Sequence, residues 1–185
     1  GRLKEIRKRL GIPTIFNLLG PLSNPFFDKH QVIGVYDSSL KLTFARVLRS
    51  LGSRHVLVVH GKDGLDEVTT TAKTQVSELR NKTIRSYTLD PKSFGLHRSK
   101  PKDLKGGDAE TNAAIAEEVL SGKSGPQRDI VVLNAACALY AADHVKSIKE
   151  GMTRAQESID SGKAMEKLKQ LRMFSQGEVL VLEHS

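Results

Sequence analysis

The stretch QVIGVYDSSLKLTFARVLRSLGSRHVLVVHG, residues 31–61, decides the fold class. It begins and ends with apolar runs, residues 31–37 and 55–61, whose continuous rather than alternating character predicts buried strands. Between them, apolar side chains recur at the spacing of a helix that ends at Gly52, namely Leu40, Phe44, Val47, Leu48 and Leu51. The stretch therefore predicts a βαβ unit, whose two parallel strands are joined by a right-handed crossover.

The rest of the chain extends this pattern. Residues 129–136, DIVVLNAA, predict a third buried strand, and the alternation within 75–95 predicts an exposed antiparallel hairpin that turns at RNKT. Helices are predicted over 106–125, from Cys137 to about Lys149, over 154–162 after a capping-box pattern at Thr153 and Gln156, and over 163–172. We predict one α/β unit over 1–185, with a mainly parallel central sheet flanked by helices. Three buried strands are few for this length, so we expect it to be the C-terminal part of a larger α/β domain.

Composition narrows the classes of function. The chain has 185 residues with 38% apolar and 27% charged side chains, which is typical of a globular protein. It contains no apolar run of about 18 residues that could span a membrane. The single cysteine, Cys137, lies in an apolar helical run and excludes a disulfide framework, so we expect it to be buried in a cytoplasmic protein. The net charge of +8 favours anionic partners such as phosphates, carboxylates or nucleic acid.

Two adjacent acids, Asp66 and Glu67, follow the predicted strand 55–61 within HGKDGLDEV. Ligands of open α/β sheets gather at the carboxyl ends of the strands, and Mg²⁺ prefers carboxylate oxygens together with water and substrate phosphates. Gly61 and Gly64 would let the backbone approach a ligand closely. Neighbouring acids also occur on ordinary solvated loops, so the residues alone leave a metal site and a surface loop both open.

Other possible binding residues in the sequence give weaker indications of function. The helix before LGIP contains the basic residues Arg7, Lys8 and Arg9, and an arginine facing a cleft would suit a carboxylate because its planar fork matches two oxygens. Residues 106–108, GGD, best fit a helix cap, and the six histidines show no metal spacing, although His60 could face the cleft.

Five blocks of sequence resemble the anthranilate phosphoribosyltransferase family. They are RKRLGIPTIFNLLGPLSNP (7–25), QVIGVYD (31–37), HVLVVHGKDGLDEVTTT (55–71), YTLDPKSFGL (87–96) and DIVVLNAACALYAA (129–142), in the order seen in that family. The resemblance covers nearly the whole chain, and several long motifs in the right order are far more specific than any one of them.

The resemblance implies a magnesium-dependent glycosyltransferase of tryptophan biosynthesis, located in the cytoplasm. Such enzymes transfer phosphoribose from phosphoribosyl pyrophosphate to the amine of anthranilate and release pyrophosphate. It also implies that Asp66 and Glu67 hold Mg²⁺ and that Arg7 contacts the anthranilate carboxylate; it assigns no catalytic residue. The full-length family is homodimeric through a helical domain, so a chain without that domain could be a monomer.

The chain also departs from the family pattern. Pro13 stands where family members often carry arginine, and the N-terminal helical domain and the glycine-rich substrate loop precede the region that matches. We therefore expect this chain alone to be inactive. The alternative is a non-catalytic paralogue that binds nucleic acid, supported by the positive charge and Pro13 but weakened by an aromatic content of only 5%.

Overall fold

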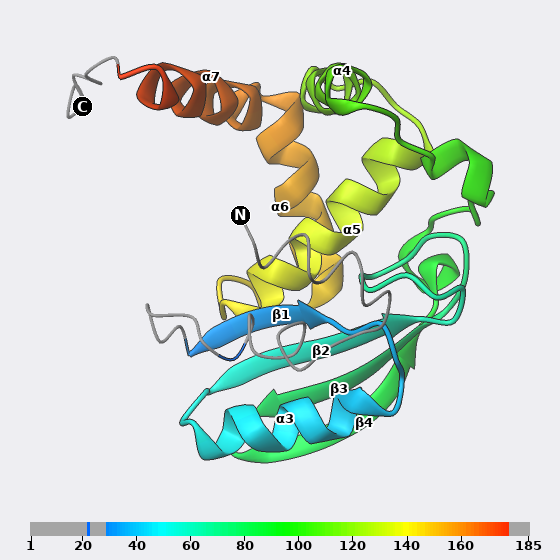
Figure 1. Ribbon diagram of the computed structural model, residues 1–185, viewed down its shortest axis with the longest axis vertical. Coiled ribbons are helices and arrows are strands. Elements are labelled where there is room, and N and C mark those ends of the chain that lie inside the picture. The colour runs from blue at the N-terminus through cyan, green and yellow to red at the C-terminus, as the bar shows by residue number, and fades with distance from the viewer. Residues whose placement is uncertain (1–21, 23–28, 178–185) are drawn as a thin grey trace, which may run out of the picture.

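The computed structural model describes Leu22 and residues 29–177. Along the chain, the elements with more than one described residue are β1 (His30–Gly34), α3 (Leu40–Ser50), β2 (His55–Gly61), β3 (Thr74–Arg80), β4 (Thr83–Leu89), two short 3-10 helices (Pro91–Phe94 and Pro101–Leu104), α4 (Ala109–Leu120), α5 (Pro126–Ala141), α6 (Ile148–Asp160) and α7 (Lys163–Ser175). Figure 1 shows the sheet with α3 on one face and α5 and α6 on the other. This arrangement confirms the α/β class and the helical layers predicted from the sequence.

The described strands form one mixed sheet in the order β1-β2-β3-β4. β1 and β2 are parallel, with His30 opposite His55, and α3 connects them, which confirms the βαβ unit. β3 pairs antiparallel with both β2 and β4, which confirms the hairpin. Its turn residues Asn81 and Lys82 have φ of 47° and 68°, as a tight two-residue hairpin turn requires. β3 lies inside the sheet and is largely buried, so the prediction of two exposed strands is right for β4 and wrong for β3.

Residues 129–136 are not a strand, and this prediction was wrong. They belong to α5, which begins with Pro126 at its first turn, after Gly125. Val, Ile and Leu side chains made the segment look like a strand, but it continues into NAACALYA without a break. The buried side chains of α5 recur at helical spacing, namely Val132, Leu133, Ala136, Cys137 and Ala141. The length of the apolar segment and its alanine content therefore favour a helix, although its β-branched residues alone would favour a strand.

Helix boundaries depend on individual caps. The Asp108 carboxylate accepts a hydrogen bond from the Thr111 amide at 2.9 Å, which confirms the predicted cap of α4. The predicted helices at 137–149 and 154–162 are wrong in their bounds: α5 ends at Ala141 and α6 begins at Ile148. The reason is a capping pair six residues earlier than the one predicted, in which Ser147 Oγ accepts from the Glu150 amide and Glu150 Oε2 accepts from the Lys146 amide.

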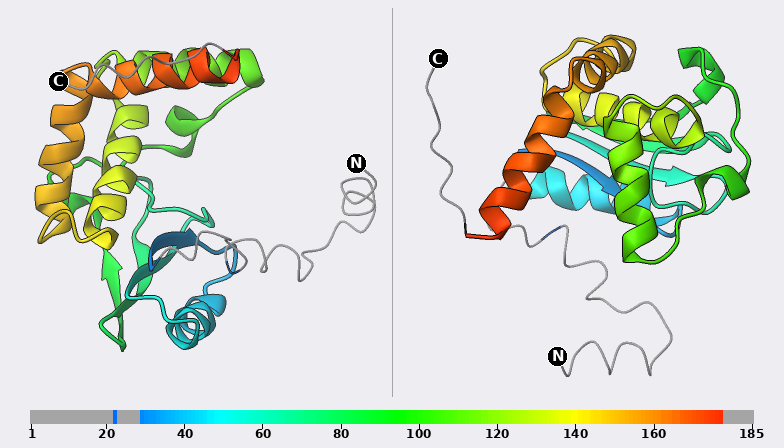
Figure 2. Two further views of the ribbon diagram at one scale, coloured as in Figure 1. Left: turned by 90° about the vertical axis from the view of Figure 1, so that its left-hand side faces the viewer. Right: turned by 90° about the horizontal axis from the view of Figure 1, so that it is seen from above.

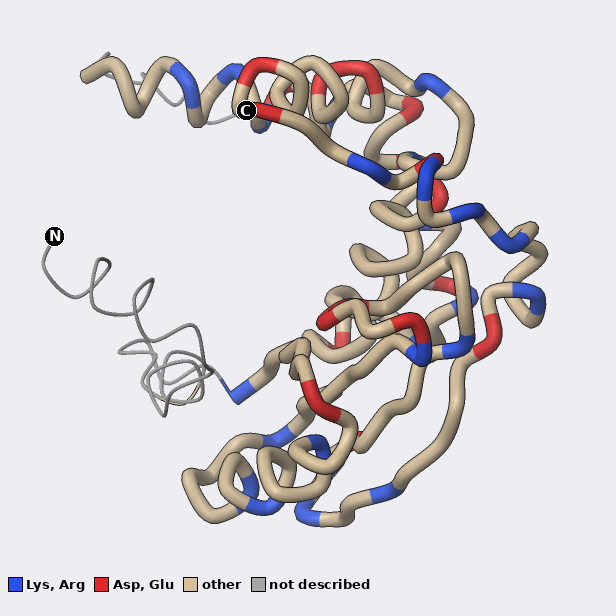
Figure 3. Tube along the Cα trace, turned by 45° about the vertical axis from the view of Figure 1, so that its right-hand side comes forward, with Lys and Arg blue, Asp and Glu red and all other residues tan. Residues whose placement is uncertain are grey.

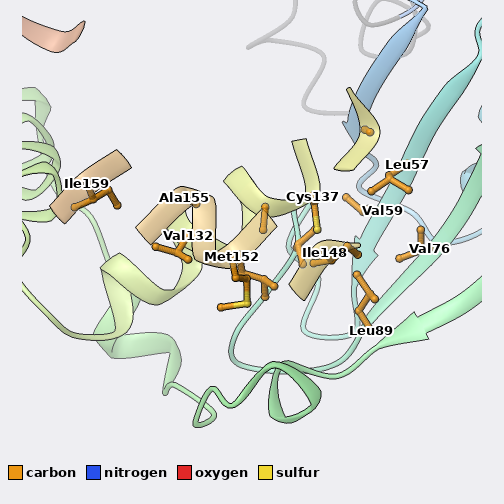
Figure 4. Packing of buried hydrophobic residues seen from close by; sticks show 14 of the residues in the cluster. Leu57, Val59, Val76, Leu89, Val132, Cys137, Ile148, Met152, Ala155 and Ile159 are labelled. Carbon is orange, nitrogen blue, oxygen red and sulfur yellow. The ribbon is translucent and has the colours of Figure 1, made fainter. Parts of the chain in front are cut away.

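Two apolar cores hold the layers together. The larger lies between the sheet and helices α5 and α6, and Figure 4 shows side chains of β2, β3, α5 and α6 meeting there. Cys137 lies in this core with no exposed surface, as predicted, and burial raises the pKa of its thiol to about 12. The smaller core joins α3 to the other face through Phe44, Ala45 and Leu48. Figure 1 and the left view of Figure 2 show α4 and α7 at the far ends of α5 and α6, away from the sheet. No helix in the described part is long and apolar enough to cross a membrane.

A buried histidine connects the amino end of β2 to its neighbours. His55 Nε2 lies 3.0 Å from Glu78 Oε1 on β3, and Nδ1 lies 2.9 Å from Asp143 Oδ1 after α5. Because each nitrogen faces a carboxylate oxygen, both contacts are hydrogen bonds only when the imidazole carries two protons. Tyr140 also donates to Glu78, at 2.9 Å. Desolvation opposes ionisation of Glu78, but the hydrogen bonds from His55 and from Tyr140 outweigh it and lower its pKa.

Asp143 occupies a backbone position that usually suits glycine. Its φ is 56°, in the left-handed region, directly after the end of α5. Its amide donates to the Tyr140 carbonyl and the His144 amide to the Leu139 carbonyl, both at 3.0 Å, which closes the helix as a Schellman motif. An aspartate tolerates this conformation better than most residues, and here its carboxylate reaches His55.

We expect Glu78→Gln to flatten the acid side of the stability curve. The folded-state pKa of Glu78 lies below its ordinary value of 4.5, so the ionised carboxylate stabilises the fold above that value. This contribution is lost as the pH falls through the lower, folded-state pKa. Urea unfolding between about pH 3 and pH 7 should therefore show a steeper acid loss for the native sequence than for Glu78→Gln. The exposed Glu118→Gln serves as the control, and equal slopes for all three proteins would contradict the prediction.

Candidate metal centre

Asp66 and Glu67 lie in the loop that joins β2 to β3, residues 62–73. This loop leaves the carboxyl end of β2, which is also the carboxyl end of the parallel strand β1. Both acids are exposed, whereas Val68 and the next two residues are fully buried. The sequence prediction that both acids stand at the ligand-binding edge of a parallel strand pair is therefore met by the fold.

The loop rests directly on β1. A methyl group added to Gly34 would lie 1.4 Å from the Asp66 carbonyl oxygen, so only glycine leaves room for the loop backbone. The loop is also closed on itself, because the Gly61 amide donates to the Leu65 carbonyl at 2.8 Å. Gly64 has a φ of 94°, which supplies the left-handed turn between them. Gly34, Gly61 and Gly64 thus set the path of the loop that carries the acid pair, a structural role that differs from the close approach to a ligand predicted for Gly61 and Gly64.

Asp63 ties the loop together from within. Its carboxylate accepts hydrogen bonds from the Thr69 hydroxyl at 2.6 Å, from the Thr71 hydroxyl and from the Leu65 amide. Desolvation opposes ionisation of Asp63, but these hydrogen bonds outweigh it and lower its pKa. The sequence reasoning did not single out Asp63. The sequence did contain a signal, because Asp63 stands three residues before Asp66 and six residues before the first of three consecutive threonines.

Asp66 and Glu67 are different, because within the part of the chain that the structure describes neither carboxylate has a hydrogen bond or an ion pair. Loss of solvent raises the pKa of Glu67, and the negative charges of Asp66 and then Asp63 raise it further. A cation between the two acids would relieve this repulsion. Two free carboxylates also offer the hard oxygen ligands that Mg²⁺ prefers, so the residues fit that ion.

Glu67 also borders a groove of about 350 Å³ between the loop and helices α4 and α5. The groove has an apolar floor and a polar rim, and its lining includes Leu104, Gly106, Asn112, Ile115, Gln127 and Ile130. Asn112 holds the rim in place, since its amide group makes hydrogen bonds of 2.9 and 3.0 Å with the backbone of Gly107. The acids therefore stand at the edge of a hollow rather than on a flat surface.

The remaining residues singled out from the sequence are Arg7, Pro13, His60 and Asp108. Arg7 and Pro13 lie outside the described residues. His60 does not carry chemistry at the loop: its Nδ1 lies 2.8 Å from the Val35 carbonyl, a contact that fastens β2 to the residue following β1. Asp108 is a helix cap, as expected.

One histidine cluster was not foreseen. His30, His55 and Asp143 bring possible ligand atoms within 4.8 Å of one another. His55 is already engaged by Glu78 and Asp143, and the Arg80 guanidinium lies 3.4 Å from Asp143. These contacts account for the charges, so the cluster is better explained as an ion-pair network than as a metal site.

Comparison of the sequence with known protein families identifies the family of this chain. Residues 2–165 match the family described as "Glycosyl transferase family, a/b domain". The chain therefore belongs to the glycosyl transferase family, and residues 2–165 match the α/β domain of that family.

Individual relatives of the chain carry a more specific enzyme name than the family does. The chain is 51% identical over 169 residues to the anthranilate phosphoribosyltransferase of Acetivibrio thermocellus, covering 91% of this chain and 49% of that protein. It is 52% identical over 170 residues to that of Clostridium kluyveri, covering 92% and 51%. The chain thus spans about half the length of the curated relatives that it matches.

Solved structures of the same enzyme share the fold. The anthranilate phosphoribosyltransferase of Thermus thermophilus superposes with a TM-score of 0.81 at 40% identity, over 90% of this chain and 49% of that chain. The enzyme of Saccharomyces cerevisiae in complex with PRPP and Mg gives a TM-score of 0.79 at 34% identity, over 90% and 48%. None of these relatives is named as a nucleic-acid-binding protein, and in the described part of the chain basic positions are spread along the trace rather than gathered in one stripe (Figure 3). The nucleic-acid alternative therefore finds no support here.

We expect Gly34→Ala to displace the acidic loop. The new methyl group would collide with the Asp66 carbonyl, and neither the strand nor the loop backbone can yield cheaply, so the free energy of unfolding should fall by roughly 2 kcal/mol or more. Amide hydrogen exchange over 62–71 should accelerate while that of α5 stays slow. Thr43→Ala, on the exposed face of α3, is the matched control and should leave both measurements unchanged. Native exchange in Gly34→Ala would show that the close approach does not hold the loop.

Proposed function

We propose that this chain supplies the magnesium-binding half of an anthranilate phosphoribosyltransferase, with Asp66 and Glu67 as the metal ligands. The observation that carries the proposal is a pair of carboxylates that have no partner among the described residues, on a loop held at the carboxyl end of β2. Support comes from relatives at 51% and 52% identity that carry this enzyme name. It also comes from the yeast enzyme, which binds PRPP and Mg.

The chemistry suits these residues. Transfer of phosphoribose breaks the bond between the anomeric carbon and pyrophosphate, so positive charge develops on the ribose and negative charge on the leaving group. When bound, Mg²⁺ would supply electrostatic stabilisation of the departing pyrophosphate. Asp66 and Glu67 would hold the ion from the protein side, and Asp63 would keep the loop in one conformation through the threonine hydroxyls.

The other parts of the reaction lie outside the described residues. We propose that Arg7 binds the carboxylate of anthranilate through its guanidinium, as the matching motif implies. We also propose that the half of the relatives not matched by this chain provides the helical domain, the homodimer contact and the main cradle for PRPP. On this proposal the whole protein would act in tryptophan biosynthesis, and the chain by itself would bind metal without turnover.

Asp66→Asn combined with Glu67→Gln should weaken metal binding by this chain. The change removes both negative charges and leaves the shape of the loop nearly unaltered, so binding of Mn²⁺, used as a paramagnetic substitute for Mg²⁺, should weaken at least about tenfold. Titration followed by electron paramagnetic resonance measures this directly. Glu166→Gln on α7, far from the loop, is the control. Equal Mn²⁺ affinity in the double variant and the native chain would refute the metal assignment.

Arg7→Ala should act on anthranilate alone. In an enzyme that carries this chain together with the missing half, KM for anthranilate should rise by about tenfold or more, because a charge-assisted bidentate hydrogen bond is removed. KM for PRPP should change little. Arg7→Lys, which keeps the charge but not the planar fork, should recover only part of the loss. Steady-state kinetics with each substrate varied in turn separates the two effects, and a rise confined to PRPP would contradict the assignment of Arg7.

A further inference from the structure

A single polar side chain stands out on the apolar helix α5. Asn134 Oδ1 accepts a hydrogen bond from the Val68 amide at 3.0 Å, and its Nδ2 donates to the Val68 carbonyl at 2.7 Å. Nδ2 also donates to the Ile130 carbonyl at 2.9 Å. The carboxamide therefore pairs with both backbone groups of one loop residue, in the way that a neighbouring strand would.

Val68 follows Glu67 directly, so this clamp acts next to the acid pair. The Val68 amide belongs to the peptide unit that joins it to Glu67, so a fixed Val68 amide holds the Glu67 Cα and carbonyl, which lie in the same plane. The Val68 side chain is fully buried in the larger core. Its backbone and side chain are both held, and Glu67 is left as the first exposed residue before that anchor.

The other side of the acid pair is held independently. Gly34 carries the Asp66 carbonyl against β1, and Asp63 closes the loop through Thr69. Without Asn134, the half of the loop that contains Glu67 would be attached to α5 through apolar contacts alone. The clamp and the contact at Gly34 thus hold the backbone on either side of two carboxylates that have no hydrogen-bond partner in the described part of the chain.

We propose that Asn134 is the positioning residue of the metal centre: it holds Glu67 at the distance from Asp66 at which both carboxylates bind one divalent cation. This inference rests on the proposed function, because it gives a role to a residue behind the proposed ligands. Partners behind metal ligands typically change metal affinity by 10–100-fold when they are removed. Asn134 touches neither metal nor substrate, and it acts through the backbone of Val68.

The chain offers a matched control. Asn112 on α4 makes the same two-bond clamp on the backbone of Gly107, at 2.9 and 3.0 Å. It borders the same groove as Glu67, but both of these hydrogen bonds go to Gly107 and neither goes to the acidic loop. Asn134→Leu and Asn112→Leu therefore remove the same kind of interaction, and only the first is connected to the acid pair.

The test is Mn²⁺ binding by the chain, measured by electron paramagnetic resonance with Mg²⁺ as competitor, alongside urea unfolding of each metal-free variant. Asn134→Leu should weaken Mn²⁺ binding by about tenfold or more, whereas Asn112→Leu should stay within about twofold of the native chain even where its stability falls. Amide exchange at Val68 should accelerate in Asn134→Leu only. Should Asn134→Leu fail to fold, Asn134→Ser removes the clamp and keeps a polar side chain at this half-buried position, and the same affinity loss is expected.

The outcomes separate this inference from the proposed function. A native chain that does not bind Mn²⁺, or binds it equally well after Asp66→Asn with Glu67→Gln, overturns the metal site and the role of Asn134 with it. A native chain that binds Mn²⁺ through the two acids, together with a folded Asn134 variant of unchanged affinity, overturns the positioning role alone. Equal losses in the Asn134 and Asn112 variants would assign both to general stability and also overturn it.

Discussion

The pairing of His55 with Glu78 and Asp143 is the constraint on which the arrangement of the layers depends. It joins β2, β3 and the end of α5 at one buried point, where His55 is 1% exposed. Both ring nitrogens of His55 face carboxylate oxygens, and the Tyr140 hydroxyl donates to Glu78. Because these residues come from β2, β3 and the end of α5, α5 cannot shift across the sheet without breaking buried polar contacts. The interaction therefore fixes the register between the sheet and its helical layer.

The carboxyl end of β2 differs from its amino end in whether the ionisable side chains have partners. At the amino end of β2, ionisable groups meet charged or hydrogen-bonding partners, whereas at the carboxyl end Asp66 and Glu67 are left without any in the described part of the chain. Around them the loop is closely satisfied: Asp63 receives hydroxyl and amide hydrogens, and Val68 is paired with Asn134. A rigid frame around two unsatisfied carboxylates is the arrangement expected of a binding site, because the repulsion between them is released only when a cation arrives.

The sequence predicted the parts of this architecture that depend on local pattern. The βαβ unit followed from two apolar runs with a helical period between them, and the acid pair followed from its place after β2. The segment 129–136 was misread because Ile130, Val131 and Val132 satisfy a strand and a buried helix equally well. The start of α6 was missed because two capping patterns compete within seven residues, and packing of Ile148 and Met152 into the core favours the earlier one. Asn134 and Asp63 act through contacts with residues that only the folded chain brings to them, although an asparagine in an apolar helix was a visible signal.

The contact at Gly34 has a further consequence for how such a centre can change. It joins one backbone to another, so the seat of the loop is independent of the side chains that the loop presents. Residues 66 and 67 can be exchanged while the frame that carries them stays in place. Replacing carboxylates by imidazoles there would convert the proposed site for hard cations into one suited to softer transition metals. Gly34 thus fixes where the loop lies, whereas the side chains at positions 66 and 67 would decide which ion the proposed centre binds. The two features can therefore evolve or be redesigned separately.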